Sequence, residues 1–403
     1  MKNPFKIFWC RAFQTAFRIA HPFLPYREPE VLHSVCEAAE VLKDKGVCRV
    51  LIVTDVGIVG CGLVRPLEEA LGQVGVDCVV YSGTQPNPTV DNVEQALLLW
   101  KDRECDALVA IGGGSAMDCA KALGARAVYP HKPLGKMGGV LRVRKRLHPL
   151  VAIPTTAGTG SEVTLAAVIT DPDARRKYAI MSFPLIPHYA VLDPTLTRTL
   201  PPHLTASTGM DALTHAVEAY IGRSATRRTR RLALEAVRLI FENIERAYRC
   251  GDDLEARESM LVAAYSAGVA FSESYVGYIH ALAHSLGGRY GTPHGLANAV
   301  IMPYVLEAYG KSAHKKLHRL ALAAGVCDPA DTHAEGARKF IGAVRELNSK
   351  MGIPARLGGI APEDIPELAR HAEGEANPLY PVPRLMTAVE LEQIYYKFAA
   401  DRG

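Results

Sequence analysis

The sequence predicts an α/β fold with a parallel sheet in the first half of the chain and an all-α fold in the second half. Short apolar runs alternate with amphipathic helical stretches from about residue 35 to residue 195, which is typical of parallel strands joined by helices. After Pro201 and Pro202 the periodicity is helical, and no strand-like run of comparable quality follows. With 403 residues the chain is also too long for one core, so two domains are expected.

Each strand predicted in the first half is a short apolar run. The first reads Arg-Val-Leu-Ile-Val-Thr, and the third runs directly into three glycines. The predicted strands are Arg49–Thr54, Asp77–Tyr81, Ala107–Ile111, Leu150–Ile153 and Ala190–Asp193, and the predicted helices between them are Leu63–Val74, Val90–Cys105 and Ala116–Ala125. Because parallel strands need crossover connections, these helices should cover both faces of the sheet.

The second half is predicted to be a helical domain. Its predicted helices are Ala206–Ile221, Arg227–Tyr248, Leu254–Phe271, Ser274–Leu286, Ala297–Tyr309 and Ala334–Met351. The boundary falls near residues 193–202, so we expect an α/β domain at residues 31–197 and a helical domain at residues 198–403. Residues 1–30 form a separate N-terminal segment.

The first 26 residues are basic and rich in phenylalanine. Arg11, Gln14 and Arg18 interrupt what would be the apolar stretch of a signal peptide, and no small-residue cleavage site follows. A basic amphipathic helix of this kind can lie on a membrane surface. Such a segment more often packs against its own protein or against a partner subunit, and we favour packing.

Composition excludes several classes of function. The net charge of +4 and the lack of a basic–aromatic stripe argue against nucleic-acid binding. No stretch approaches 18 uninterrupted apolar residues, so no integral membrane segment is predicted. The nine cysteines are scattered without a C-x-x-C pair, which indicates free thiols in a reducing compartment and predicts a cytoplasmic protein.

A glycine-rich loop after the third predicted strand is a candidate phosphate site. Gly112-Gly113-Gly114-Ser115 lets a ligand approach the backbone closely, and the helix that follows offers free N–H groups to an anion. In an open parallel, Rossmann-like sheet this is where a dinucleotide pyrophosphate binds. The loop lacks the G-x-G-x-x-G pattern, so a simple tight turn is the alternative.

Further polar residues follow other predicted strands. Residues 154–162 are dense in threonine and glycine, which suits a ligand-facing loop but also an ordinary polar turn. Asp55 follows the first strand, where an acidic residue often binds the ribose hydroxyls of an adenosine, although an aspartate there also commonly caps the next helix. Asn87, in Gln-Pro-Asn-Pro-Thr, is a turn residue by type.

Histidines and one aspartate in the second half form a candidate metal site. His280 and His284 are four residues apart, so a helix places them on one face, and His294 follows a break that contains glycine and proline. Upstream, Asp211 and His215 form a second pair with the same spacing. A carboxylate with imidazoles is a ligand set for zinc or ferrous iron. Periodicity alone favours His280 with His284 as the ligands from their helix.

Four motifs resemble those of the iron-containing (group III) alcohol dehydrogenases. They are Gly-Gly-Gly-Ser-Ala-Met-Asp-Cys-Ala-Lys (112–121), Pro-Thr-Thr-Ala-Gly-Thr-Gly-Ser-Glu (154–162), Gly-Met-Asp-Ala-Leu-Thr-His-Ala-Val-Glu (209–218) and the stretch 280–298. They occur in the family's order, and the similarity runs from about residue 46 to the end of the chain. The resemblance implies a dehydroquinate synthase-like architecture, with an N-terminal dinucleotide-binding domain and a helical, metal-binding C-terminal domain.

The resemblance also implies site residues. It implies Asp211, His215, His280 and His294 as the metal ligands, and it makes His284 a proton relay near cofactor and substrate rather than a ligand. The implied cofactor residues are Gly113, Gly114 and Ser115 at the pyrophosphate with Asp118 in the helix behind it, Thr155, Thr156 and Thr159 along the cofactor cleft, Lys177 near the nicotinamide ribose, and Asp55 and Asn87 toward the adenosine.

The implied activity is that of a metal-dependent alcohol dehydrogenase. It would transfer a hydride between an alcohol bound to Fe(II) or Zn(II) and NAD(H), and in reverse it would reduce an aldehyde or ketone. NAD is expected rather than NADP, because Asp55 would repel a 2′-phosphate and no arginine stands beside it. The alternative is an NAD- and metal-dependent lyase or synthase related to dehydroquinate synthase. Those enzymes favour a glutamate ligand and basic residues for an anionic substrate, whereas residues 266–280 here are apolar and aromatic.

The chain departs from the family pattern at its two ends. Residues 1–30 replace the short opening strand that family members often pair with another subunit. The family is oligomeric, so a homodimer or higher homo-oligomer is expected, and the aromatic N-terminal segment would otherwise expose an apolar patch to water. Asn377-Pro378 keeps the family's Asn-Pro, but Leu379 follows in place of the common arginine, near the substrate mouth.

Overall fold

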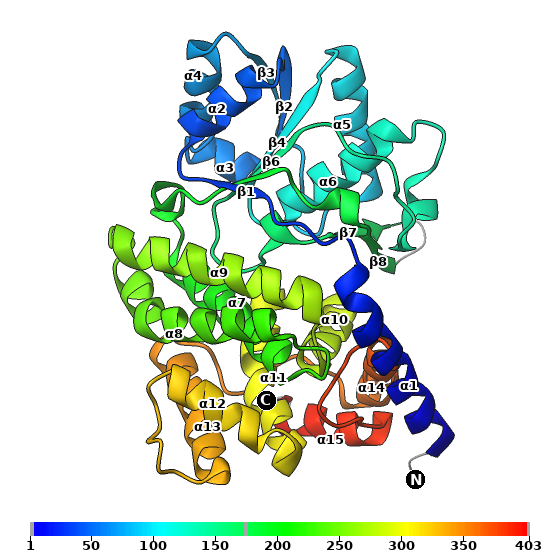
Figure 1. Cartoon of the computed structure of the whole chain (residues 1–403), viewed down its shortest axis with the longest axis vertical. Helices are drawn as coiled ribbons and strands as arrows, with labels where there is room; N and C mark the ends of the chain where they lie inside the picture. The colour runs from blue at the N-terminus through cyan, green and yellow to red at the C-terminus, as the bar shows by residue number, and fades with distance from the viewer. Residues whose placement is uncertain (1–3, 173–175, 401–403) are drawn as a thin grey trace. The chain divides into compact units, whose positions relative to one another are not determined.

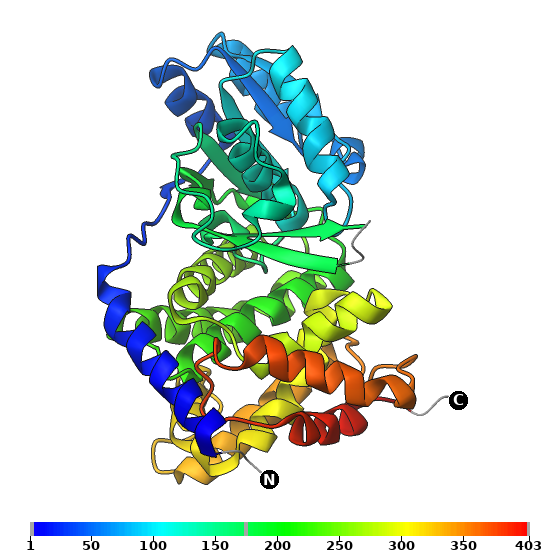
Figure 2. The same cartoon turned by 90° about the vertical axis from the view of Figure 1, so that its right-hand side faces the viewer.

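The computed structural model of the chain describes residues 4–172 and 176–400, which form two compact units (Figures 1 and 2). The α/β unit comprises Pro25–Leu200, and the helical unit comprises Met1–Leu24 together with Pro201–Gly403. The N-terminal segment, set off from the two domains at residues 1–30 in the sequence analysis, is grouped with the helical unit as far as Leu24. Its first three residues lie outside the described ranges. Within those ranges, no helix is both long and apolar enough to span a membrane.

A six-stranded parallel sheet is the centre of the α/β unit. Its strand order is β1–β9–β6–β4–β2–β3. The strands are β1 (Glu30–Leu32), β2 (Arg49–Val53), β3 (Asp77–Tyr81), β4 (Ala107–Gly112), β6 (Leu150–Pro154) and β9 (Tyr189–Val191). From β2 the chain moves to β3 at one edge of the sheet, and from β4 it moves to β6, toward the other edge. The order in which strands are added therefore reverses between the neighbours β2 and β4. Open α/β sheets bind ligands beyond the carboxyl ends of the strands at such a reversal.

Apolar residues cover both faces of this sheet. Leu51 and Val53 of β2 face one core, and Val50 and Ile52 face the other, because side chains alternate along a strand. The first core contains α5 (Val90–Asp102) and α6 (Gly114–Val128), and the second contains α2 (Val35–Asp44) and α4 (Arg65–Gln73). The short helix α3 (Val56–Gly60) follows β2. The predicted parallel sheet with helices on both faces is confirmed.

A second, three-stranded sheet was not predicted. It contains β5 (Gly139–Val140), β8 (Arg176–Met181) and β7 (Ala166–Asp171), in that order. In β7 the alternate residues Ala167 and Ile169 are buried while Val168 is exposed. Since all three are apolar, the sequence shows no alternation that would mark a half-buried strand.

After Pro201, the described part of the helical unit contains the six helices predicted for the second half of the chain and three more. They are α7 (Pro202–Ile221), α8 (Arg227–Arg249), α9 (Leu254–Ser274), α10 (Tyr278–Tyr290), α11 (His294–Tyr309), α12 (His314–Ala323), α13 (His333–Lys350), α14 (Ile365–Ala376) and α15 (Ala388–Phe398). Several predicted boundaries are displaced by three or four residues. For example, α10 starts at Tyr278 rather than Ser274, because Ser274 still belongs to α9 and Gly277 precedes α10 in an extended conformation.

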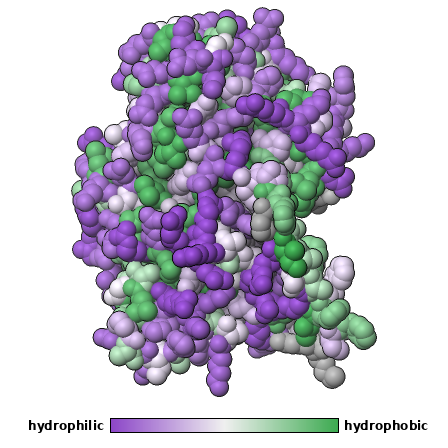
Figure 3. All heavy atoms as spheres, in the orientation of Figure 1, coloured by the Kyte–Doolittle hydropathy of each residue, from purple (hydrophilic) through white to green (hydrophobic). Residues whose placement is uncertain are grey.

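The N-terminal segment forms α1 (Pro4–Ala20), which packs against its own chain in the helical unit. The ring of Phe17 meets the ring of Tyr275 edge to face, with centroids 5.1 Å apart. The opposite side of α1 exposes apolar side chains, and Figure 3 shows such side chains gathered where Figure 1 labels this helix. The exposed large apolar residues of this segment are Phe5, Phe8, Trp9, Ile19 and Phe23.

Candidate metal centre and cofactor loops

Helix α7 presents acidic and imidazole side chains on one buried face. Asp211, His215 and Glu218 follow one another at spacings of four and three residues, so they lie along one side of the helix. Their exposed fractions are 2%, 5% and 2%. Polar groups buried to this degree need partners, and a metal ion can serve as one.

The turn between α10 and α11 brings a third element to this face. Helix α10 ends at Gly291, which adopts the left-handed conformation, and α11 begins at His294 directly after Pro293. The next residue, Gly295, lies so close to α7 that a β-carbon there would come within 2.4 Å of the Ser207 carbonyl oxygen. Only a glycine lets the start of α11 approach α7 this closely, and this approach places His294 beside Asp211.

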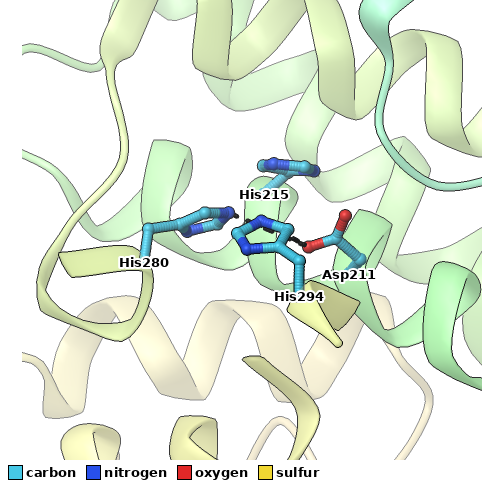
Figure 4. A group of neighbouring side chains, drawn as sticks. All are labelled: Asp211, His215, His280 and His294. Atoms are coloured by element: carbon cyan, nitrogen blue, oxygen red, sulfur yellow. Dashed lines mark ion pairs between the residues drawn. The ribbon is translucent and has the colours of Figure 1, made fainter. Parts of the chain in front are cut away.

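Four side chains converge at this point (Figure 4). Asp211, His215, His280 and His294 each offer one ligand atom, and these atoms all lie within 4.8 Å of one another. Asp211 Oδ1 lies 3.5 Å from His294 Nε2 and 3.9 Å from His280 Nε2. Ligands held about 2.1 Å from a tetrahedral metal are about 3.4 Å apart, so the spacing fits a single ion. The His215 ring stacks on Phe271 and on His280, with centroids 4.0 and 4.6 Å apart.

The protonation of His280 also fits a metal ligand. Its Nε2 is buried and makes no hydrogen bond within the described residues. Burial, together with the neighbouring histidines, holds the pKa of His280 well below its usual value, so the ring is neutral. Its Nδ1 lies 2.7 Å from Glu218 Oε2, which assigns the proton to Nδ1 and leaves the Nε2 lone pair directed at Asp211.

Glu218 is the first functional residue that sequence reasoning missed, although it closes a quoted motif. Its carboxylate accepts hydrogen bonds from the backbone N–H groups of Gly277 (2.7 Å) and Ile279 (2.8 Å) as well as from His280. Burial raises the pKa of Glu218 to about 7, although the backbone donors hold it down. One carboxylate thus caps the start of α10 and orients a candidate ligand on the same helix.

Asn298 is a second missed residue. Its Nδ2 lies 2.6 Å from Asp211 Oδ1 and 3.1 Å from His294 Nε2. The position is one helical turn after His294, so the (i, i+4) spacing on α11 was available as a signal. Asn298 therefore links the carboxylate of Asp211 to His294, the exposed residue of the cluster.

His284 does not belong to the group of four, contrary to what periodicity alone favours. Its Nδ1 lies 2.6 Å from Glu375 Oε1, which also accepts a hydrogen bond from the Tyr380 hydroxyl at 2.6 Å. Desolvation by the surrounding side chains lowers the pKa of His284, but the Glu375 carboxylate more than offsets this and raises the pKa above its usual value. The ring remains beside the cluster, stacked on His294 with centroids 5.1 Å apart. Glu375 and Tyr380 had no signal in the sequence, since they lie about 90 positions after His284.

In the α/β unit, the glycine-rich loop lies at the carboxyl end of β4. Gly112 has a φ of 150°, and a β-carbon there would come within 2.9 Å of the Ala116 side chain, so only glycine suits this position. Gly113 precedes α6 in an extended conformation without a side-chain cap, so the first N–H groups of the helix are available to an anion. A β-carbon on Gly114 would come within 3.0 Å of the Thr159 side chain, which brings the threonine loop against the start of α6.

That threonine loop follows β6, the strand next to β4. Gly112 and Pro154 are register partners, and Thr155 N–H donates to the Gly112 carbonyl at 3.0 Å. The hydroxyl of Thr156 is buried and has no hydrogen-bond partner among the residues that the structure describes. An unsatisfied hydroxyl beside Gly113 fits a loop that completes its hydrogen bonds with a bound ligand.

Asn87 and Lys177 extend this edge of the sheet. Asn87 has a φ of 59°, and its backbone N–H donates to Ser115 Oγ at 3.3 Å. Lys177 Nζ, on β8, donates to Asn87 Oδ1 at 2.9 Å, and burial lowers the pKa of Lys177. The structure therefore brings Asn87, Ser115 and Lys177 together, as an extended ligand site requires.

The two aspartates have structural partners. Asp55 Oδ1 accepts from the N–H groups of Gly57 and Ile58 and so caps α3, which is the alternative role considered from the sequence. Its other oxygen lies beside Gly112, where a β-carbon would be 3.7 Å away. Asp118, which is half-buried, accepts from Ser161 Oγ (2.8 Å) and Val168 N–H (3.0 Å), so its carboxylate ties α6 to the end of the threonine loop and to β7.

Comparison with known proteins identifies the family. The profile of iron-containing alcohol dehydrogenases matches residues 31–194, and the profile of the C-terminal domain of that family matches residues 205–399. The chain belongs to the iron-containing alcohol dehydrogenase family. This confirms the resemblance and the predicted enzyme class, an oxidoreductase of the alcohol dehydrogenase type rather than a lyase.

Individual relatives cover most of the chain. Alcohol dehydrogenase 4 of Saccharomyces cerevisiae (strain YJM789) is 41% identical over 346 residues, which are 84% of this chain and 88% of the relative. The NAD-dependent methanol dehydrogenase of Bacillus methanolicus is 37% identical over 363 residues, 90% of this chain and 95% of the relative. The crystal structure of a 1,3-propanediol oxidoreductase matches with a TM-score of 0.89 at 36% identity, covering 92% of this chain and 98% of that chain. These structural matches confirm the predicted fold class.

Proposed function

We propose that this member of the family is an NAD-dependent alcohol dehydrogenase that holds one divalent ion, Fe(II) or Zn(II), on Asp211, His215, His280 and His294. The observation that carries the proposal is the convergence of these four ligand atoms within 4.8 Å on three different helices. A carboxylate with three imidazoles is a ligand set that both ions accept. The ion, when bound, would supply a Lewis acid that stabilises negative charge on the alcohol oxygen.

The chain's own residues supply access and proton transfer. Asp211, His215 and His280 are buried, whereas the side chain of His294 is 40% exposed, so a substrate can approach the cluster from the His294 side. The side chain of His284 is 41% exposed and lies on that same side. His284 is therefore suited to exchange the alcohol proton with water.

The α/β unit would bind the dinucleotide. Gly113, Gly114 and Ser115 offer the free N–H groups of α6 to the pyrophosphate, and Thr156 offers its buried hydroxyl. Asp55 lies at the end of β2, next to the point where the chain reverses direction, and its charge favours NAD over NADP. NAD, when bound, would supply the hydride acceptor.

The substrate class follows from the helical unit. Phe271 stacks on His215, and the stretch 266–280 that leads to His280 is apolar and aromatic, so we infer a small or medium alcohol and its aldehyde or ketone rather than a phosphorylated compound. Nine free cysteines support a reducing compartment, and we place the enzyme in the cytoplasm. The exposed apolar side of α1 supports a homodimer or higher oligomer.

The test combines activity with metal analysis. Protein reconstituted with Fe(II) or Zn(II) should reduce NAD in the presence of some members of a panel of short alcohols, measured as the absorbance of NADH. His294→Ala should lose the metal or bind it far more weakly. His284→Ala should keep about one ion per chain while its turnover falls by roughly 10²–10⁴-fold, the usual worth of a proton relay. A metal-free His284→Ala protein beside a metal-replete His294→Ala protein would overturn the ligand assignment.

A further inference from the structure

Helix α1 is attached to the rest of the helical unit by polar contacts in addition to the ring contact of Phe17 with Tyr275. Its buried side chains are Cys10 and Gln14. Its hydrogen bonds reach residues between 364 and 372 positions later in the sequence, and Lys6 forms an ion pair with Glu373 of α14. The polar residues on the inner face of α1 therefore have a role other than filling a hydrophobic core.

The segment that α1 contacts is a proline-rich loop, residues 378–383, which we call the proline loop. It contains Pro378, Pro381 and Pro383. Proline has no N–H group, so this loop cannot form a regular backbone hydrogen-bond ladder of its own. Its carbonyl groups must therefore find donors in other parts of the fold or in water.

Two side chains of α1 supply those donors. Gln14 Nε2 donates to the carbonyls of Pro378 (3.1 Å) and Tyr380 (2.8 Å). Arg11 Nη1 donates to the carbonyl of Val382 (2.9 Å) and to Gln14 Oε1 (2.7 Å). Gln14 is only 6% exposed, and both ends of its amide are satisfied by these bonds. The side chain is therefore specifically oriented toward the proline loop.

Tyr380, whose backbone carbonyl accepts a hydrogen bond from Gln14, is connected through Glu375 to His284. The backbone carbonyl of Tyr380 is bonded to Gln14, and the Tyr380 hydroxyl donates to Glu375 Oε1 at 2.6 Å. The same oxygen of Glu375 lies 2.6 Å from His284 Nδ1. Tyr380 is 7% exposed, so its ring cannot move without moving its backbone. Hydrogen bonds at the backbone and at the side chain of Tyr380 thus join α1, through this residue, to the candidate proton relay.

We propose that α1 is a positioning element of the active centre, in which Gln14 fixes the proline loop and thereby sets the orientation of Tyr380, Glu375 and His284. This inference rests on the proposed function, because it assigns the segment's effect to the proton relay. Neither Gln14 nor Arg11 touches the metal cluster or the substrate; both act through the loop. Helix α1 lies outside the residues that the family profiles match, and here it stabilises a loop that is linked to the candidate proton relay.

The test uses full-length, metal-loaded protein and one matched control. Gln14→Met keeps the length of the side chain and removes both donors to the loop. The control is Thr15→Ala, since Thr15 is exposed and its hydroxyl donates to the Arg11 carbonyl inside α1. We expect Gln14→Met to lower kcat by roughly tenfold, a fraction of the 10²–10⁴-fold worth of the relay itself. Metal content and the KM for NAD should stay within twofold of wild type, and Thr15→Ala should match wild type throughout.

A double-mutant cycle separates positioning from general destabilisation. Tyr380→Phe removes the hydroxyl through which Gln14 would act. If the proposal holds, adding Gln14→Met to Tyr380→Phe lowers kcat by less than a further twofold. If the effects of the two substitutions on kcat multiply in full, Gln14 does not act through the Tyr380 hydroxyl and the proposal is wrong. Arg11→Met, which leaves Gln14 in place, tests the same loop if Gln14→Met does not fold.

Hydrogen–deuterium exchange gives a readout that does not depend on the reaction. Exchange across residues 376–386 should become faster in Gln14→Met and stay unchanged in Thr15→Ala, with or without metal. Unchanged exchange in Gln14→Met would overturn the proposal, as would a wild-type kcat beside faster exchange. A wild-type protein that oxidises no alcohol would instead contradict the proposed function, while the exchange result would still report whether Gln14 holds the loop.

Discussion

Replacing Glu218 by glutamine should weaken metal binding without removing any proposed ligand. The carboxylate accepts three hydrogen bonds: two at Oε2, from Gly277 N–H and His280 Nδ1, and one at Oε1, from Ile279 N–H. A glutamine has one acceptor oxygen, so its least costly orientation keeps the bonds at Oε2 and turns its NH₂ toward Ile279. In that orientation the hydrogen bond from Ile279 N–H is lost, and the amide NH₂ group faces this N–H, so two donors oppose each other. The free energy of unfolding should therefore fall by about 1–3 kcal/mol.

The effect on the metal comes from His280. A neutral amide accepts a weaker hydrogen bond from Nδ1 than a carboxylate does, so His280 becomes a poorer and less firmly oriented ligand. Loss of such a partner typically lowers metal affinity by about 10–100-fold, or about 1.4–2.7 kcal/mol. The assay is competition with a chelator as Fe(II) or Zn(II) is titrated into metal-free protein. Glu375→Gln is the control, because Glu375 bonds to His284 rather than to a proposed ligand. If Glu218→Gln melts normally and binds metal within threefold of wild type, the assigned role of Glu218 is wrong.

Three further predictions concern the cofactor, the pH dependence of stability and assembly. Asp55→Gly should raise the NADP-to-NAD ratio of kcat/KM by roughly tenfold, or 1.4 kcal/mol; an unchanged ratio, or a wild type that uses both cofactors equally, would contradict the role of Asp55. Burial, with nearby cationic side chains, lowers the pKa of His188 to about 4, so the native state resists protonation and loses stability as the pH falls from 6.5 toward 4. Because the ring is partly exposed, the free energy of unfolding should fall by about 1–2 kcal/mol over this pH range, measured by urea denaturation. His188→Asn still accepts a hydrogen bond from Leu150 N–H, so this variant should lose the pH dependence. Trp9→Glu, on the exposed side of α1, should shift the oligomer distribution in light scattering, and a monomeric wild type at micromolar concentration would refute the expected dimer.

The parallel sheet was predictable because its central strands are buried on both faces. Residues 50–53 are apolar without interruption, and such a run between turn residues has few other interpretations. The strands that were missed lack this signal. β1 is three residues long, and β7 belongs to a small sheet in which apolar Val168 faces solvent. Short or atypically patterned strands are specified by tertiary contacts, which periodicity does not report.

The candidate site was predictable only in part, for a related reason. The spacing of Asp211 and His215 shows that they share a helix face, but the choice between His284 and His294 depends on how the turn after Gly291 folds back toward α7. Partners that come from distant segments leave no periodic trace. Glu375 and Gln14 belong to this class, since each reaches its partner across long stretches of sequence.

His280 and His284 show why the second partner of a histidine decides its role. Both lie on the same side of α10, and both direct Nδ1 at a carboxylate. For His280 that carboxylate is Glu218, buried on α7, and the ring, at 2% exposed, turns Nε2 into the cluster beside Asp211. For His284 it is Glu375 on α14, and the side chain remains 41% exposed at the edge of the cluster. The first environment suits the neutral ligand proposed for the cluster, and the second suits a ring that exchanges protons with water. Four residues of spacing cannot distinguish these roles, whereas the position of each carboxylate can.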